Sequence, residues 1–291
     1  MPVTLRPAHR PSESGDTDRR RVLDRGAASR TLRPISRRIR RWVPPAVVLV
    51  VLAVAWELAT DVFGVEAYIL PAPSAVAHAL VDRWDSTLAS ATWATLTEVV
   101  VGFAIAVGAG LLIACGLHFS RVARSALYPW LIGSQTVPVV VIAPILAIIF
   151  GYSLTPKLIL VALLCFFPIV VATLDGLSVV DDDLKRMMRT LYGTRWSIFL
   201  RVEFPAALPS LFTGLRLSAA YASTAAVFGE YSGSSDGLGH VMRQAVPQLQ
   251  SALVFAAIIL LSAMSIALFI LVTALERVLV GWAHERKSTT T

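Results

Sequence analysis

Six long apolar runs dominate the sequence. A helix that crosses a bilayer needs about 20 consecutive apolar residues, because the hydrocarbon core is about 30 Å thick. With 56% hydrophobic and only 15% charged residues, the chain is too apolar for a surface that faces water everywhere. The sequence therefore predicts a polytopic membrane protein with six transmembrane helices. These lie at Val43 to Phe63, Trp93 to Leu117, Leu127 to Phe150, Lys157 to Val180, Ser210 to Glu230, and Leu253 to Val280.

The apolar runs are continuous and show no alternation. Strands of a membrane barrel alternate apolar and polar positions, whereas the stretch VPPAVVLVVLAVAW does not. Helices satisfy their backbone hydrogen bonds within the segment, as the bilayer requires. We therefore expect an all-α fold. Cys115 and Cys165 both fall inside predicted spans without metal-ligand spacing, so we interpret them as packing residues.

Positive charge is concentrated at one end of the chain. Twelve arginines precede Trp42, which predicts a cytoplasmic N-terminus. Six spans return the C-terminus to the same side, and they also place Arg121, Arg124 and the basic stretch 181–209 there. We expect a multi-pass protein of a bacterial cytoplasmic membrane. The arginine-rich tail lacks interleaved aromatic residues, so we expect no nucleic acid as a partner. The lipid bilayer is expected to surround the spans.

The expected organisation has one membrane domain. Residues 1–42 have few apolar positions and are predicted to be a disordered cytoplasmic tail. Residues 43–285 form the transmembrane domain, and 286–291 form a second cytoplasmic tail. Outside the membrane, Pro71 and Pro73 interrupt the chain and Ser74 is a candidate cap of a short helix. A second short external helix is expected in the stretch 232–252.

The segment from Asp181 to Ser218 is too structured for a plain linker. Its three leading aspartates favour the positive end of a helix, and LKRMMRTLY carries apolar residues at three- and four-residue spacing. Gly193 is expected to stop this helix, and Pro205 and Pro209 to bracket the turn into the fifth span. Two interpretations remain open: an amphipathic hairpin that rests on lipid headgroups, or a docking surface for a soluble partner.

Four stretches resemble a known family. They are ILPAPSAVAHAL, TVPVVVIAPILAIIFGYS, LLCFFPIVVATLDGL and RVEFPAALPSLFTGLRLS. They resemble the permease subunits of ABC importers, in the branch that handles nitrate, sulfonates, taurine and thiamine or flavin precursors. The resemblance implies a homodimeric permease that translocates a small polar solute delivered by an extracytoplasmic binding protein. It also implies a separate ATPase subunit, which binds ATP and Mg.

The family carries a cytoplasmic signature whose short helix docks into a cleft of the ATPase. Its Glu-Ala-Ala falls on Arg186, Met187 and Met188, and its glycine falls on Tyr192, one residue before Gly193. The second half of the signature, aligned on Pro205, matches well. The residues that the resemblance assigns to ATPase coupling are Arg186, Met187, Arg189, Tyr192, Gly193, Arg195, Trp196 and Pro205.

The sequence contains no recognisable catalytic motif. The phosphate loop GxxxxGK[ST], the HExxH metal site, the GxSxG nucleophile turn and Cys/His clusters are all missing. We therefore expect no enzyme activity, cofactor or metal on this chain. A proton-coupled secondary transporter and a non-transporting membrane scaffold remain the alternative functions.

Charged and kinked positions within the spans need separate interpretation. Glu98, Asp175 and Glu230 lie near span ends, where they are expected to reach water. Glu57 lies deeper, where it would pair with a neighbouring helix, be protonated or relay protons. Proline in a span frees a carbonyl that can face a cavity or merely marks a packing kink. The candidates for the translocation path are Pro138, Pro144, Gly151, Pro168, Asp175, Gly229 and Glu230.

Overall fold

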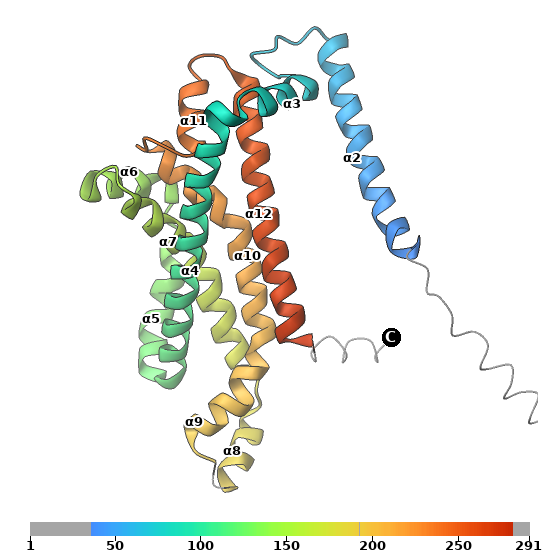
Figure 1. Ribbon diagram of the computed structural model, residues 1–291. Helices are drawn as coiled ribbons and strands as arrows, with labels where there is room; N and C mark the ends of the chain where they lie inside the picture. The colour runs from blue at the N-terminus through green and yellow to red at the C-terminus, as the bar shows by residue number, and fades with distance from the viewer. Residues whose placement is uncertain (1–35, 192, 282–291) are drawn as a thin grey trace, which may run out of the picture. The chain divides into compact units, whose positions relative to one another are not determined.

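The computed structural model describes residues 36–191 and 193–281, and every regular element within them is helical (Figure 1). The chain divides into two units at the bond between Ala55 and Trp56. The elements are α2 (Ser36–Val62), α3 (Pro73–Asp82), η2 (Trp84–Leu88), α4 (Ala89–Phe119), α5 (Arg121–Ser134), α6 (Val139–Phe150), α7 (Leu154–Leu177), α8 (Asp182–Thr190), α9 (Arg195–Ile198), η3 (Phe199–Glu203), α10 (Phe204–Tyr231), α11 (Leu238–Ala245) and α12 (Ser251–Leu279).

Four helical stretches are long and apolar enough to cross a membrane: Trp84–Phe119, Leu154–Leu177, Arg195–Tyr231 and Ser251–Leu279. They contain or overlap the expected second, fourth, fifth and sixth spans, and they confirm an all-α polytopic membrane protein. The first expected span falls in α2. This helix begins at Ser36, so residues 36–42, expected in the tail, belong to the helix. Residues 1–35 and the expected tail 286–291 lie outside the described residues.

The third expected span is two helices. The prediction of one helix from Leu127 to Phe150 is wrong, because α5 ends at Ser134 and the shorter apolar helix α6 begins at Val139. Pro138 occupies the N-cap of α6 with extended backbone angles. The ring of a proline excludes the preceding residue from helical geometry, and the polar residues Ser134, Gln135 and Thr136 interrupt the apolar run, so the chain turns over residues 135–138.

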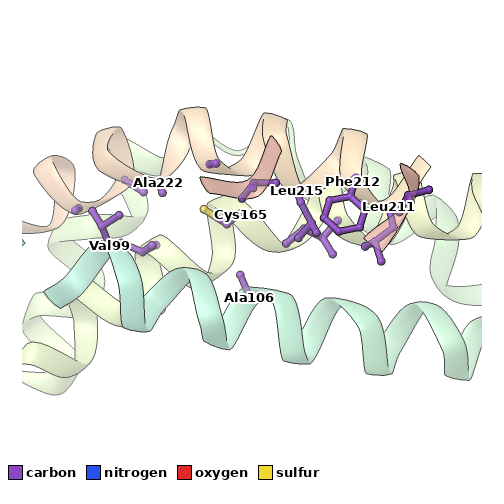
Figure 2. Close-up of a cluster of buried hydrophobic side chains, with 14 residues drawn as sticks. Val99, Ala106, Cys165, Leu211, Phe212, Leu215 and Ala222 are labelled. Atoms are coloured by element: carbon purple, nitrogen blue, oxygen red, sulfur yellow. The ribbon is translucent and has the colours of Figure 1, made fainter. Parts of the chain in front are cut away.

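The core is formed by α4, α7 and α10. Figure 2 shows Val99 and Ala106 of α4, Cys165 of α7 and Leu215 of α10 gathered in one buried cluster. Small residues let these helices approach closely, as is common between membrane helices. A Cβ added at Gly214 would lie 2.6 Å from the carbonyl oxygen of Pro168. Cys165 is fully buried there, in agreement with its expected packing role.

The short helices lie at opposite ends of the bundle. α3 and α11 lie at one end of α10, and α8 and α9 lie at the other (Figure 1). We refer to these as the α11 end and the α8 end. Short helices were expected at the positions of both α3 and α11, but the cap of α3 differs. Ser74 does not cap the helix. Its N–H and hydroxyl both donate to the Glu57 carboxylate, at 3.0 and 2.6 Å, so Glu57 pairs with α3.

Candidate functional site

At the α8 end, the sequence determines a short helix with defined caps. The Asp181 side chain accepts a hydrogen bond from Asp183 N at 3.0 Å and so caps α8. Asp182 and Asp183 lie in its first turn and Arg189 in its last, which matches the helix dipole at both ends. The predicted helix over LKRMMRTLY is therefore confirmed as far as Thr190. Tyr192, one of the expected coupling residues, lies outside the described residues.

Gly193 closes α8. Its N–H donates to the carbonyl oxygen of Met188 at 3.0 Å, and an added Cβ would lie 2.7 Å from that same oxygen. The expected stop at this glycine is confirmed, and its physical cause is the close approach of the chain to the preceding helix. Thr194 then caps α9, because its hydroxyl accepts from Ser197 N at 3.2 Å.

Aromatic rings support α9. The Trp196 ring stacks on Phe199 with a centroid separation of 5.5 Å, and Phe199 also contacts Phe119 at 4.9 Å. Phe204 packs on Phe199 from the start of α10. Since Phe119 belongs to α4, the cluster joins the short helices to two membrane helices. Such ring pairs stabilise by about 0.5–1.5 kcal/mol each beyond their buried area.

A set of polar contacts joins the same elements. His118 Nε2, at the end of α4, lies 2.8 Å from Glu203 Oε2, and Lys185 Nζ of α8 lies 3.6 Å from Glu203 Oε1. Glu203 is buried. Lys185 also pairs with Asp182 on its own helix at 3.2 Å. Neither His118 nor Glu203 was predicted as part of this site, because His118, Lys185 and Glu203 are far apart in the chain.

The turn expected at Pro205 and Pro209 is absent from the described residues. Arg195–Tyr231 instead runs as one continuous helical stretch, with Pro205 in the first turn of α10 and Pro209 inside it. The π-helical segment η3 ends directly before α10. A widened turn of this type makes room for a proline ring, which in a regular α-helix meets the carbonyl four residues earlier.

Several apolar side chains in and next to α8 and α9 are exposed. Leu184, Met187, Leu191 and Trp196 are exposed, with Trp196 at 59%. Arg186 is also exposed and lies 3.8 Å from Asp183. On the same helix, Asp182, Lys185 and Arg189 line a cavity on the inner side. Because residues three and four apart share a helix face, α8 presents an apolar outer face and a polar inner face.

The translocation-path candidates are spread over separate places. Pro138 caps α6, Pro144 lies exposed within it, and Gly151 ends it with a φ of 72°. Asp175 is exposed in the last turn of α7, so its expected access to water agrees with the structure. Pro168 lines a small cavity together with Gln135 and Tyr221. Their role in the path stays a prediction.

Gly229 and Glu230 lie at the α11 end. A Cβ at Gly229 would lie 3.3 Å from Leu160 and Lys157 of α7, so this glycine serves close helix packing. Glu230 is fully buried, and the expectation that it reaches water is wrong. Its Oε1 accepts from the Thr95 hydroxyl at 2.6 Å, and its Oε2 accepts from Gly239 N at 2.5 Å. The carboxylate therefore caps the first turn of α11.

A second acidic side chain of the same region is also buried. Glu98 is 1% exposed, which contradicts its expected contact with water. Lys157 Nζ donates to Glu98 Oε1 at 2.7 Å and to Asp236 Oδ1 at 2.9 Å. The bond from the Lys157 ammonium holds the pKa of the Asp236 carboxyl below its usual range. We call Thr95, Glu98, Lys157, Glu230 and Asp236 the polar cluster.

The polar cluster connects four elements. Thr95 and Glu98 come from α4, Lys157 from α7 and Glu230 from α10, while Asp236 precedes α11. Charges inside a bundle are tolerated when they pair with one another. A lysine in an otherwise apolar run is the one sequence signal that pointed to this cluster. Lys157 was predicted to begin the fourth span.

Comparison with known proteins identifies the class. Residues 106–280 match the family described as "Binding-protein-dependent transport system inner membrane component", and the chain belongs to this family. It is 34% identical to the formylaminopyrimidine transport permease protein ThiX of Halalkalibacterium halodurans, over 83% of this chain and 96% of that protein. It is also 34% identical to the riboflavin transport system permease protein RibX of Chloroflexus aurantiacus, over 86% and 95%.

A more distant relative and a solved structure agree with this. The taurine transport system permease protein TauC of Escherichia coli is 28% identical over 87% of this chain and 93% of its own length. The inward-facing MetNI methionine ABC transporter matches the fold with a TM-score of 0.50 at 19% identity, over 63% of this chain and 94% of that chain.

The chain is thus the permease subunit of an ABC importer, a multi-pass protein of the plasma membrane. Permeases of this family are non-enzymatic membrane subunits, and their membership implies an ATPase and a substrate-binding protein as partners. The resemblance seen in four sequence stretches is confirmed.

Proposed function

We propose that residues 181–209, the coupling segment, are the surface on which a separate ATPase docks, and that this ATPase binds ATP and Mg and performs the hydrolysis. The observation that carries the proposal is the uncovered apolar face at the α8 end, formed by Leu184, Met187, Leu191 and Trp196. A large exposed apolar patch is typical of a protein–protein interface. Basic residues surround it, in keeping with a cytoplasmic location.

The charge of the segment suggests what the partner presents. Arg186 stands where relatives in the family carry the glutamate of their signature, and its side chain is 78% exposed. Its distance of 3.8 Å from the exposed Asp183 makes a weak pair that a partner carboxylate can replace. We therefore propose a docking cleft with acidic side chains that face Arg186, while Met187 and Trp196 fill apolar pockets.

The contacts behind the segment support a route for transmitting motion. The segment continues directly into α10 and is joined to α4 by the ring contact of Phe199 with Phe119 and by His118 with Glu203. Displacement of α8 and α9 by the ATPase would then move α4 and α10 together. In a homodimer of permeases, such rigid movements of packed helices alternate the access to a central path.

The solute side of the proposal rests on the relatives. The 34% identical proteins are named as permeases for formylaminopyrimidine and riboflavin, whereas the taurine permease is 28% identical. We propose a small polar solute, with nitrogen heterocycles of this kind to be tested first. An extracytoplasmic binding protein would deliver it at the α11 end. Pro138, Pro144, Gly151, Pro168 and the neighbouring candidates remain proposed path residues.

The docking proposal is tested by co-purification. The full chain is expressed with the ATPase encoded beside it, and the ATPase retained per permease is measured after detergent extraction. Trp196→Ala removes an exposed aromatic anchor, for which about 2 kcal/mol or more of binding energy is expected, or about a 30-fold loss of affinity. The matched control is Trp93→Ala, since Trp93 is 71% exposed at the other end of α4.

Equal retention of the ATPase by wild type, Trp196→Ala and Trp93→Ala would show that the docking surface lies elsewhere. If no ATPase is retained by the wild-type chain and solute uptake collapses with the proton gradient, the ATP-driven proposal fails and the carrier alternative replaces it.

A further inference from the structure

A basic cavity lies behind the coupling segment. Its volume is about 840 Å³, and its walls come from the end of α4, the start of α5, the end of α7 and the inner face of α8. The outer, apolar face of α8 takes no part in it. Five cationic side chains line it, Arg121, Arg124, Lys185, Arg189 and Arg195, and the His118 ring lines it as well.

The acidic side chains that line this cavity already pair with basic side chains of the protein. Asp182 pairs with Lys185 at 3.2 Å, and Glu203 lies 2.8 Å from His118 and 3.6 Å from Lys185. No ion pair within residues 36–191 and 193–281 involves any of the four arginines Arg121, Arg124, Arg189 and Arg195. The cavity therefore has a surplus of positive charge that is available to an anion.

The four arginines come from three helices, so the cavity is formed by the way these helices pack. Arg121 and Arg124 lie in the first turn of α5, where the positive end of a 14-residue helix adds to their charge. Arg189 lies in the last turn of α8, and Arg195 begins α9. A planar guanidinium binds phosphate oxygens in pairs, so four of them suit a phosphate group better than a single carboxylate.

The cavity also borders the apolar surface of the bundle. α4 ends at Phe119 and α7 at Leu177, and both of these residues line the cavity. Val122 lines it as well, although its side chain is 81% exposed, and Trp130 on the same helix is 78% exposed. A ligand with both a phosphate group and a hydrocarbon chain would therefore contact both the basic and the apolar walls of the cavity.

We propose that this cavity binds the phosphate headgroup of an anionic phospholipid, with the acyl chains against Val122 and the exposed apolar face of α5. Basic pockets between membrane helices at the cytoplasmic boundary bind such headgroups. Free phosphate shares the headgroup chemistry but gains nothing from the apolar wall. The site is distinct from the exposed apolar side chains proposed to contact the ATPase, because it uses the inner face of α8 and the start of α5.

Occupancy would influence the coupling segment. A headgroup held between Arg121 of α5 and Arg189 of α8 would bridge the two helices and hold α8 at a defined distance from the membrane. The lipid composition of the membrane would then modulate the position of the docking surface.

The test uses the full chain, purified in detergent, delipidated and analysed by native mass spectrometry. The probes are phosphatidylglycerol, the zwitterionic phosphatidylcholine and inorganic phosphate. We expect wild type to bind phosphatidylglycerol at least tenfold more tightly than phosphatidylcholine. The double variant Arg121→Gln/Arg124→Gln should lose about fivefold in phosphatidylglycerol affinity for each arginine, or about 25-fold in all. Arg121→Lys/Arg124→Lys keeps the charge but loses the paired guanidinium bonds, so it should bind phosphatidylglycerol more weakly than wild type but still more tightly than phosphatidylcholine.

The matched control is Arg83→Gln/Arg277→Gln, which removes two exposed arginines that lie outside the cavity. It should bind phosphatidylglycerol as wild type does. If the two glutamines prevent folding, the lysine variant and the lipid preference of wild type still decide the question.

Three results would overturn the proposal. The first is equal affinity of wild type for the two lipids. The second is inorganic phosphate that displaces phosphatidylglycerol at equal concentration, which would indicate a soluble anion. The third is lipid binding unaffected by Arg121→Gln/Arg124→Gln while ATPase retention falls, which would indicate an acidic protein surface as the occupant.

Discussion

The polar cluster at the α11 end yields the most quantitative prediction. The Lys157 side chain is 6% exposed and lies between Glu98, at 2.7 Å, and Asp236, at 2.9 Å. Glu98 is nearly fully buried, and within the described residues its Oε2 has no hydrogen-bond partner. Lys157→Met therefore removes the cation on which this carboxylate depends. Removing one partner of a buried ion pair costs about 3–5 kcal/mol.

A double-mutant cycle separates this effect from lost packing. Glu98→Gln/Lys157→Met also removes the charge of the buried Glu98 carboxylate, so the double variant should be more stable than Lys157→Met alone. The coupling free energy should be about 1–3 kcal/mol. The assay is the free energy of unfolding in mixed detergent micelles, followed by tryptophan fluorescence.

An exposed pair on the same chain provides the control. Arg186 and Asp183 lie 3.8 Å apart with side chains 78% and 87% exposed, so Arg186→Met should cost about 0–1 kcal/mol. The reasoning is refuted if Lys157→Met costs no more than Arg186→Met, or if the cycle shows no coupling.

Three further predictions concern other positions. Gly237 has a φ of +98°, and a Cβ there would collide with the Glu230 carboxylate, so Gly237→Ala should destabilise by about 1–3 kcal/mol. Its control, Gly108→Ala in open space on α4, should stabilise by about 0.5–1 kcal/mol, and chemical unfolding measures both. Asp236 has a lowered folded-state pKa, so its contribution is present above the usual aspartate value of 3.8 and is lost as the pH falls through the lowered value. The Tm of wild type should thus exceed that of Asp236→Asn near neutrality and converge with it in acid; a constant difference would contradict this. Gly193→Ala places a Cβ 2.7 Å from Met188 O, so it should reduce co-purification of the ATPase, whereas an unchanged yield would show that α8 tolerates the shift.

Hydropathy predicted the long spans because their signal is local. The runs around α4, α7 and α12 are apolar enough that any window of about 20 residues reveals them. The same measure failed over Leu127 to Phe150, since a window of this length averages over the short polar stretch 134–136 and does not register the effect of Pro138 on the backbone. Pro205 and Pro209 led to the opposite error, a predicted turn where the helix is continuous. Pro205 lies in the first turn of α10 directly after the π-helical segment η3, and Pro209 lies within α10 itself.

The short helix of the coupling segment could be predicted from contacts between residues close in sequence, whereas the polar cluster could not. Asp181 and Gly193 determine the ends of α8 through contacts within a few residues. Glu230, in contrast, meets Thr95 across 135 positions of the chain. A carboxylate near a predicted span end has no local signal that distinguishes contact with water from a buried partner. Only the packing of α4 against α10 determines which of the two occurs.

The most direct test of ATP-driven coupling through α8 is site-specific photo-cross-linking in membranes that contain the full chain and its ATPase. A photoreactive side chain is placed at Met187 on the exposed face of α8, or at Leu249 at the α11 end, where the side chain is comparably exposed. The account predicts an ATPase adduct from Met187 and none from Leu249. An adduct from Leu249, or none from Met187 in a complex that still co-purifies, would contradict docking through α8.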